Sequence, residues 1–188
     1  MVAHFDYYYN KGDVSGNGRG VVLIPRTTCG ESKMNTENTT EGAYANSIAN
    51  TTTCPAIANA LSTILGSYLL SNKLLFSKDM NANIPSMAGA NVTGASANWN
   101  WYSSQCVLPN EIQIYGSTVY SSSFYDVSES CDKLAIFNFI NHVEYGRVAF
   151  WLRAVDSATG FAYANSDGSA RGNNASISHS LRPLIYIG

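Results

Sequence analysis

Charged residues are scarce in this sequence. Only 13% of its 188 residues are Asp, Glu, Lys or Arg, against a typical value of about 25% in soluble proteins. The 11 basic residues are scattered along the chain and the formal net charge is −2. A nucleic acid needs several phosphate-neutralising groups on one face, so we expect no nucleic-acid partner. Solubility must come from Asn, Ser, Thr and Gly instead.

Long apolar runs are lacking as well. No stretch approaches the roughly 20 apolar residues needed to cross a bilayer, and residues 1–7 do not show the basic-then-apolar pattern of a secretion signal. A hydrophobic share of 45% in 188 residues suits a folded chain with its own core. The sequence therefore predicts a single domain over 1–188, with 1–20 as a lead-in and no insertion into a membrane.

Cysteine pairs with metal-binding spacing are absent. Cys29, Cys54, Cys106 and Cys131 form no Cys-x-x-Cys motif and have no regular spacing to the three His residues, which argues against a zinc site. Four cysteines allow three disulfide pairings. A domain of this length folds without such staples, so buried free thiols are the favoured expectation.

Signatures of catalysis are missing too. The chain has no Gly-x-Ser-x-Gly elbow, and a hydrolase needs a nucleophile, a base and an orienting group. Glu111 and Asp126 remain candidates for the two catalytic carboxylates that a glycosidase uses. Calcium would need oxygen ligands at compact spacing, and the candidates, in no recognisable order, are Asp156, Asn165, Asp167 and Asn173. We predict no enzyme, no cofactor and no metal.

Five residue types are missing from the C-terminal stretch 154–188, namely Lys, Glu, Gln, Met and Trp, although they make up 20 of the 188 residues. An Asn codon ending in a pyrimidine cannot become any of these five when only its adenines change, so the composition permits adenine-directed diversification. Residues 154–180 are mostly Gly, Ala, Ser, Asn, Asp, Tyr and Thr. Antibody-type loops are rich in the same kinds of small, polar and tyrosine side chains. This predicts a recognition surface; the alternative is that 165–168 and 172–174 are only turns between strands.

The clearest predicted element is a helix over 55–70. Its apolar residues recur at helical spacing, which places them in one stripe that should pack under a sheet: Ile57, Leu61, Ile64, Leu65 and Tyr68. Pro55 suits the first turn, and residues 51–53 offer capping hydroxyls. Gly66 indicates either close packing or the end of the helix.

The other segments give a mixed pattern. Strands are expected at 21–25, at 111–115 with Ile112 and Ile114 on one face, and at 148–153. Residues 29–53 should be an ordered loop, and 134–143 either a strand or a short helix. Residues 79–98 are expected to be a surface excursion. The aromatic group 99–102 should anchor that excursion to the core, with stacking on a sugar as the alternative.

Several motifs carry a resemblance to a known family. They are Trp151-Leu-Arg-Ala-Val-Asp-Ser-Ala, Phe161-Ala, Gly168-Ser-Ala, Ala175-Ser and Leu181-Arg-Pro-Leu-Ile, with upstream segments at 34–44, 55–57, 65–70 and 111–116. In these motifs the chain resembles the variable proteins of diversity-generating retroelements, which are common in phages and prophages of gut bacteria. The resemblance covers the chain from about Val21 onward.

The resemblance implies an α+β fold of the C-type-lectin kind, with one main helix packed on twisted antiparallel strands. It implies a display protein on a virion or a bacterial cell surface that recognises a host-surface protein or glycan through a diversified region, 154–181. Other virion or surface-protein subunits would be further partners. The rival interpretation is a structural module for capsid decoration or tail assembly.

The predicted binding face consists of the polar, small or aromatic positions of that region: Ala154, Asp156, Thr159, Gly160, Tyr163, Asn165, Ser166, Asp167, Ser169, Arg171, Gly172, Asn173, Asn174, Ile177 and His179. The interleaved frame should be buried and consists of Val155, Phe161, Ala162, Ala164, Ala170 and Ala175. Arg153 and Arg182 flank the region. We expect them to tie the frame to carboxylates or carbonyls rather than to bind ligand.

Overall fold

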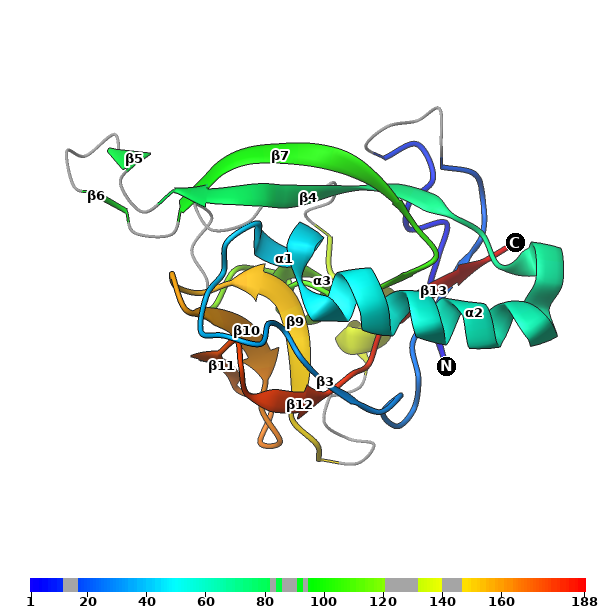
Figure 1. Ribbon diagram of the computed structural model, residues 1–188. Coiled ribbons are helices and arrows are strands. Elements are labelled where there is room, and N and C mark those ends of the chain that lie inside the picture. Colours follow the sequence, from blue (N-terminus) through cyan, green and yellow to red (C-terminus); the bar gives the residue numbers. More distant parts are fainter. Residues whose placement is uncertain (12–16, 82–83, 86–90, 93–94, 121–131, 140–146) are drawn as a thin grey trace.

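The computed structural model of the protein describes residues 1–11, 17–81, 84–85, 91–92, 95–120, 132–139 and 147–188. It confirms the expected α+β class: most elements are strands in several sheets, and one helix is much longer than the others (Figure 1). Asp126 and Cys131 lie outside the described residues, so the expectations placed on them stay predictions.

A four-stranded antiparallel sheet joins the two ends of the chain. Its strands, in spatial order, are β1 (Val2–Phe5), β2 (Val21–Leu23), β13 (Leu184–Ile187) and β8 (Cys106–Val107). β2 contains Val22 and precedes Ile24, both fully buried, which confirms the strand expected at 21–25. The expected lead-in is part of the domain, because it supplies β1 and the buried core residues Tyr7 and Tyr8.

A five-stranded sheet carries the C-terminal stretch. Its order is β11 (Ala170–Asn174), β10 (Gly160–Ala164), β9 (Phe150–Val155), β12 (Ser178–Ser180) and β3 (Glu31–Lys33). All neighbours are antiparallel except β9 and β12. Every residue of β9 is buried, so this strand is the spine of the sheet. The strand expected at 148–153 is confirmed with a shift of two residues.

The predicted helix is confirmed as α2 (Cys54–Leu65), but its start differs from the prediction. A π-helical segment, Ala49–Thr53, leads directly into it, and Thr53 makes no side-chain capping bond. The hydroxyls at 51–53 are therefore not caps. Gly66 has φ +54°, and no described atom lies within 4 Å of where its Cβ would stand. It marks the end of α2, which a 3₁₀ turn, Gly66–Tyr68, follows.

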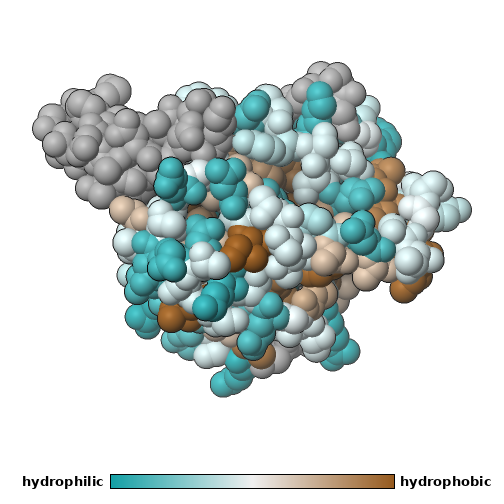
Figure 2. All heavy atoms as spheres, in the orientation of Figure 1, coloured by the Kyte–Doolittle hydropathy of each residue, from teal (hydrophilic) through white to brown (hydrophobic). Residues whose placement is uncertain are grey.

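Only part of the apolar stripe on α2 is covered. Ile64 is 81% exposed and Tyr68 67% exposed, while the other three stripe residues are partly buried against the core. The second half of α2 extends beyond the sheets (Figure 1), and Figure 2 shows apolar side chains at that end of the molecule. The expectation that the whole stripe packs under a sheet is wrong, because the helix is longer than the surface beneath it.

Residues 29–53 contain more structure than the expected loop. Besides β3 and the π-helical segment they form α1 (Ala43–Asn46). Tyr44 of α1 is buried, and its hydroxyl accepts a hydrogen bond from the Leu108 amide at 3.0 Å. The segment thus contributes to the core.

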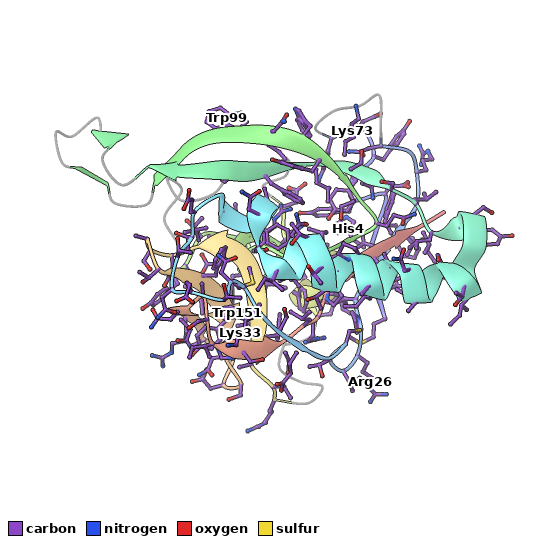
Figure 3. All side chains as sticks on the ribbon, viewed as in Figure 1. His4, Arg26, Lys33, Lys73, Trp99 and Trp151 are labelled. Carbon is purple, nitrogen blue, oxygen red and sulfur yellow. The ribbon has the colours of Figure 1, made fainter. Side chains whose placement is uncertain are left out.

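The excursion expected at 79–98 belongs to a long hairpin where it is described, and 82–83, 86–90 and 93–94 lie outside the described residues. The hairpin strands β4 (Asn72–Asn81) and β7 (Ala95–Ser104) extend away from the body, with the short strands β5 (Ile84–Pro85) and β6 (Asn91–Val92) near the tip (Figure 1). Tyr102 stacks on Phe76 with ring centroids 5.4 Å apart. Trp99 is 54% exposed and Trp101 37% exposed, and Figure 3 shows Trp99 on the outer side of the hairpin. Of the three rings, only Tyr102 packs into the core as expected.

The strand expected at 111–115 is wrong: the residues form the short helix α3 (Glu111–Tyr115). The Asn110 side chain accepts from the Gln113 amide, and the Gln113 side chain accepts from the Asn110 amide, each at 2.9 Å. This reciprocal capping box satisfies two amides that a helix start leaves without partners. The capping box selects the helical conformation, because the segment is too short for apolar periodicity to distinguish a helix from a strand.

Replacing Asn110 with alanine should lower the free energy of unfolding by about 1–2 kcal/mol, the usual cost of a lost N-cap. Urea unfolding of Asn110→Ala beside Asn110→Asp tests this, because Asp keeps an acceptor oxygen at the same place. An alanine variant as stable as the aspartate variant would contradict the capping role.

The segment expected as strand or short helix at 134–143 is helical where it is described, as the 3₁₀ turn Ala135–Asn138. The imidazole of His4 holds this turn, since its Nδ1 accepts from the Ala135 amide at 3.0 Å. His4 must therefore have an unprotonated Nδ1.

Both framing arginines are buried, as expected of anchors. Arg182 donates from Nε and Nη2 to the Pro25 carbonyl at 3.3 and 3.1 Å, and its guanidinium lies over the Phe150 ring. The Arg153 guanidinium lies over the Phe76 ring, with 5.1 Å to the centroid. Arg182 thus ties the last strand to the loop after β2, and Arg153 ties β9 to the hairpin.

Candidate functional site

A stack of aromatic rings forms the centre of the five-stranded sheet's outer surface. The ring of Tyr163, on β10, lies on the imidazole of His179, on β12, with centroids 4.4 Å apart and planes 20° apart. Both meet the edge of Trp151, on β9, at centroid distances of 6.0 and 4.6 Å. Trp151 is fully buried and its Nε1 donates to the Ser32 carbonyl at 2.9 Å. Two half-exposed rings are thus held on a fixed third ring.

The hydrogen bonds of Asn173 define the protonation of His179. Asn173 Oδ1 accepts from the Asn174 amide at 2.9 Å, so its Nδ2 is the atom that faces His179 Nε2 at 3.1 Å. An amide nitrogen only donates, and His179 Nε2 must therefore accept. His179 is neutral in this arrangement, with its proton on Nδ1. Burial also lowers the pKa of His179.

A tight turn borders the stack between β10 and β11. The Gly168 amide donates to the Asn165 carbonyl at 3.0 Å, and Gly168 has φ +92°. Asp167 Oδ1 accepts from the Ser169 amide and hydroxyl at 2.9 and 2.6 Å; the hydroxyl bond is the main reason that the pKa of Asp167 is lowered. Arg171 Nε donates to the same hydroxyl at 3.2 Å. One carboxylate and one guanidinium are thus presented to solvent in defined positions.

The interpretation of 165–168 and 172–174 as turns is only partly confirmed. Residues 165–168 form the turn just described, but 172–174 belong to β11 and pair with 160–162 of β10. A turn and a recognition surface do not exclude each other, because the turn holds Asp167 in place.

The other side of β11 carries a half-buried carboxylate. Asp156 lies against Gly160 and Gly172, and the Tyr120 ring also lies over Gly172. Burial raises the pKa of Asp156, and the nearby Glu111 carboxylate raises it further. Glu111 is itself buried and accepts from the amides of Val119 and Tyr120 at 3.1 and 2.9 Å. Glu111 is thus a structural residue that holds the segment after α3 against the sheet.

The predicted division between face and frame matches the burial in the structure at most positions. All but two of the proposed face residues are exposed or half-exposed, and all but one of the proposed frame residues are buried. The two buried face residues are Ala154, on β9, and Gly160, whose Cβ would lie 2.6 Å from the Asn173 carbonyl oxygen. The half-exposed frame residue is Ala170, on the edge strand β11. These three assignments are wrong; contact of the others with a ligand stays a prediction.

Distant segments complete the face, and sequence reasoning missed them. β3 borders His179 through the pairs His179 with Ser32 and Ser178 with Lys33. Asn38 Oδ1 accepts from the amide and hydroxyl of Ser176 at 3.3 and 2.6 Å. No local pattern indicates these contacts, because strand pairing brings together segments more than a hundred residues apart.

Within the described ranges, no group of three or more His, Cys, Asp or Glu side chains could hold an ion. Asn165 and Asp167 lie in the turn after β10, whereas Asp156 lies near Gly160 at the other end of that strand. The structure thus places Asp156 apart from Asn165 and Asp167. No helix in the described part of the chain is long and apolar enough to cross a membrane.

We expect stability to fall as the pH drops below about 6.5, the ordinary His pKa. Burial lowers the pKa of both His179 and His4, so the folded protein takes up protons less readily than the unfolded chain. Their contribution is complete above the unfolded pKa and is lost as the pH falls through the folded values. Urea unfolding between pH 7.5 and 5 measures it. In His179→Gln the free energy of unfolding should depend less steeply on pH, and the remaining dependence should be that of His4. An unchanged dependence on pH would contradict the role given to His179.

Comparisons of the chain with protein-family models, with curated proteins and with solved structures find no match. The functional assignment therefore depends on the geometry of the face and on the composition of the segment that builds it.

Proposed function

We propose that this domain recognises a ligand through the solvent-facing side chains of 156–179, called here the recognition face. The observation that carries the proposal is the half-exposed stack of Tyr163 and His179 on the buried Trp151, with Arg171 and Asn173 beside it. Rigid rings supply contact area at low entropic cost, and the flanking groups supply hydrogen bonds. Such a face binds without a covalent step.

The chemistry of the recognition face suits a ligand selected by shape and hydrogen bonding. Asp167 and Arg171 are the oppositely charged groups beside the stack and both bond Ser169, whereas Asp156 lies on the other side of β11. Long-range steering by charge needs a surface of one sign, which this face lacks. A host-surface protein or a glycan offers the matching pattern of hydroxyl, amide and apolar groups.

The proposal includes the C-type-lectin-like fold and diversification of the face, as the resemblance to variable proteins of diversity-generating retroelements implies. One main helix with mainly antiparallel strands is compatible with that fold. Two independent observations favour diversification: residues 154–188 lack the five types that adenine changes cannot produce, and most proposed positions reach solvent. The protein would act on a virion or on a bacterial cell surface.

A structural role in capsid decoration or tail assembly is the second candidate. The observation that favours it is the exposed apolar end of α2, where Ile64 and Tyr68 lie uncovered. Apolar side chains of this kind are typical of contacts between subunits. In this case the end of α2, rather than the recognition face, would carry the main interaction.

Binding to intact gut bacterial cells, and to glycan and protein arrays, tests the two candidates. One variant replaces Asp156, Tyr163, Asn165, Asp167, Arg171 and Asn173 with alanine; its matched control replaces Ile64 and Tyr68. We expect the first variant to lose at least about tenfold in affinity, as hot-spot truncation does, with little change in melting temperature. The control should bind like the original protein. Binding lost only in the control would favour the assembly role.

A further inference from the structure

A cavity of about 300 Å³ lies between the start of α2 and the base of the β4–β7 hairpin, away from the recognition face. The stacked rings of Phe76 and Tyr102 line it, and its lining also includes Cys54 and Cys106. None of the described residues that line it is charged. The cavity therefore offers small neutral molecules a path to two buried thiols, which come from α2 and from β8.

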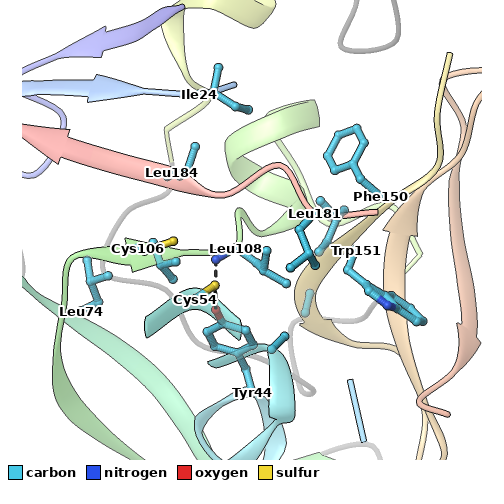
Figure 4. Packing of buried hydrophobic residues seen from close by; sticks show 14 of the residues in the cluster. Ile24, Tyr44, Cys54, Leu74, Cys106, Leu108, Phe150, Trp151, Leu181 and Leu184 are labelled. Atoms are coloured by element: carbon cyan, nitrogen blue, oxygen red, sulfur yellow. Dashed lines mark hydrogen bonds between the residues drawn. The ribbon is translucent and has the colours of Figure 1, made fainter. Parts of the chain in front are cut away.

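The sulfur of Cys54 lies beside two groups that can donate a hydrogen bond. One is the Cys106 thiol. The other partner is the Tyr44 hydroxyl, 3.7 Å from the sulfur. The Tyr44 oxygen already accepts from the Leu108 amide at 3.0 Å (Figure 4), so its hydrogen is available for the sulfur. Donors directed at a sulfur favour its thiolate form.

The two thiols consequently differ in character. The hydrogen bond from Cys106 lowers the pKa of Cys54, and the same bond raises the pKa of Cys106. In oxidation-sensitive cysteine pairs, the thiolate of one cysteine reacts with the oxidant. The thiol of the second cysteine then attacks the oxidised sulfur and forms a disulfide. Cys54 is the nucleophile of this pair and Cys106 is the resolving partner.

We propose that Cys54 and Cys106 are a dithiol that hydrogen peroxide, entering through the cavity, oxidises to a disulfide joining α2 to β8. The Cys54 sulfur attacks one peroxide oxygen and the O–O bond breaks; the departing hydroxide takes up the proton that the Cys54 thiol released, giving water and a sulfenic acid. The Cys106 sulfur then attacks the Cys54 sulfur and the S–O bond breaks. The hydroxyl leaves with the Cys106 proton as a second water. Two thiols are oxidised and one peroxide is reduced.

Cys29 provides a control within the same chain. It is more exposed than the other two described cysteines and does not line the cavity. Burial and the nearby Cys54 raise the pKa of Cys29, and the Arg182 guanidinium offsets this only in part. If exposure alone determined oxidation, Cys29 would react first. The geometry assigns the first reaction to the buried pair instead.

Peptide mapping of the folded, full-length chain after peroxide treatment tests the proposal. Remaining thiols are alkylated after denaturation, and each cysteine peptide is quantified by mass spectrometry. We expect a cross-linked Cys54–Cys106 peptide, two hydrogens lighter than its parts, while Cys29 stays alkylated. In Cys106→Ser, Cys54 should stop at the sulfenic acid and react with a 1,3-dione probe. Oxidation of Cys29 with Cys54 and Cys106 still alkylated, or cross-linking only in urea, would overturn the proposal.

A variant of Tyr44 tests the hydrogen-bond arrangement without removing a thiol. Tyr44→Phe keeps the buried ring and removes only the hydroxyl. The oxidation of Cys54 should slow by about tenfold, which corresponds to one hydrogen bond to a charged group. A variant that remains folded by circular dichroism and reacts at the original rate would contradict the role of Tyr44 in activating the thiol.

Discussion

Replacing Trp151 with alanine is expected to lower the free energy of unfolding by about 3–5 kcal/mol, the range found for buried tryptophans. Trp151 is fully buried in the central strand β9, its indole donates to the Ser32 carbonyl on β3, and its ring contacts Tyr163 and His179. Its removal would leave a cavity under the recognition face and an unsatisfied carbonyl. Ligand binding should be lost together with stability.

Two matched variants separate burial from hydrogen bonding. Trp99→Ala removes a ring that is 54% exposed, so we expect a cost below about 1 kcal/mol, as for surface substitutions. Trp151→Phe keeps an aromatic ring and loses the bond to Ser32, with an expected cost of about 1–3 kcal/mol for a buried acceptor left without a partner. Urea unfolding measures all three. A Trp151→Ala variant no less stable than Trp99→Ala would show that the stack is not a structural support.

The second large effect is expected at a glycine. In Gly160→Ala the new Cβ would lie 2.6 Å from the Asn173 carbonyl oxygen, a backbone atom of the paired strand β11. The strand must shift to relieve this contact, which should cost about 1–3 kcal/mol, as overpacking does. Gly160 is thus fixed by close strand pairing and cannot carry a variable side chain.

Gly172→Ala is the matched comparison, because it lies on the opposite strand in the same pair of strands. Its Cβ would first meet the ends of the Asp156 and Tyr120 side chains, which can rotate away. We expect a cost below about 1 kcal/mol, together with a change in the pKa of Asp156 that its carboxyl resonance would report by NMR. Equal losses of stability at the two glycines would refute the distinction between frame and face at these positions.

Apolar runs and helical spacing predicted the existence of α2, β2 and β9. They did not predict the burial, because part of the α2 stripe is exposed whereas every residue of β9 is buried. α3 was predicted as a strand because Ile112 and Ile114 alternate, but two apolar residues in five positions are too few to establish a strand period. Its capping pair, Asn110 and Gln113, was the sequence signal that could have corrected the prediction.

The candidate site was predictable in composition but not in its contacts. Small and polar residues in 154–181 indicated which positions face solvent, and most of them do. Gly160 and Ala154 were misassigned because a small residue fits both an open surface and a crowded interior. The contributions of Ser32, Asn38 and Tyr120 depend on strand pairing and on the path of the chain after α3, and no local sequence pattern contains that information.

A library of all single substitutions over 154–181, sorted separately for protease resistance and for ligand binding, tests the central claim most directly. The claim is that a replaceable recognition face lies on a fixed frame. We expect the exposed and half-exposed positions, Tyr163, Arg171 and Asn173 among them, to tolerate most residues without loss of protease resistance while binding changes. The frame, with Ala154 and Gly160, should tolerate few. If the face positions are as intolerant as the frame, or if substitutions there leave binding unchanged, the account is contradicted.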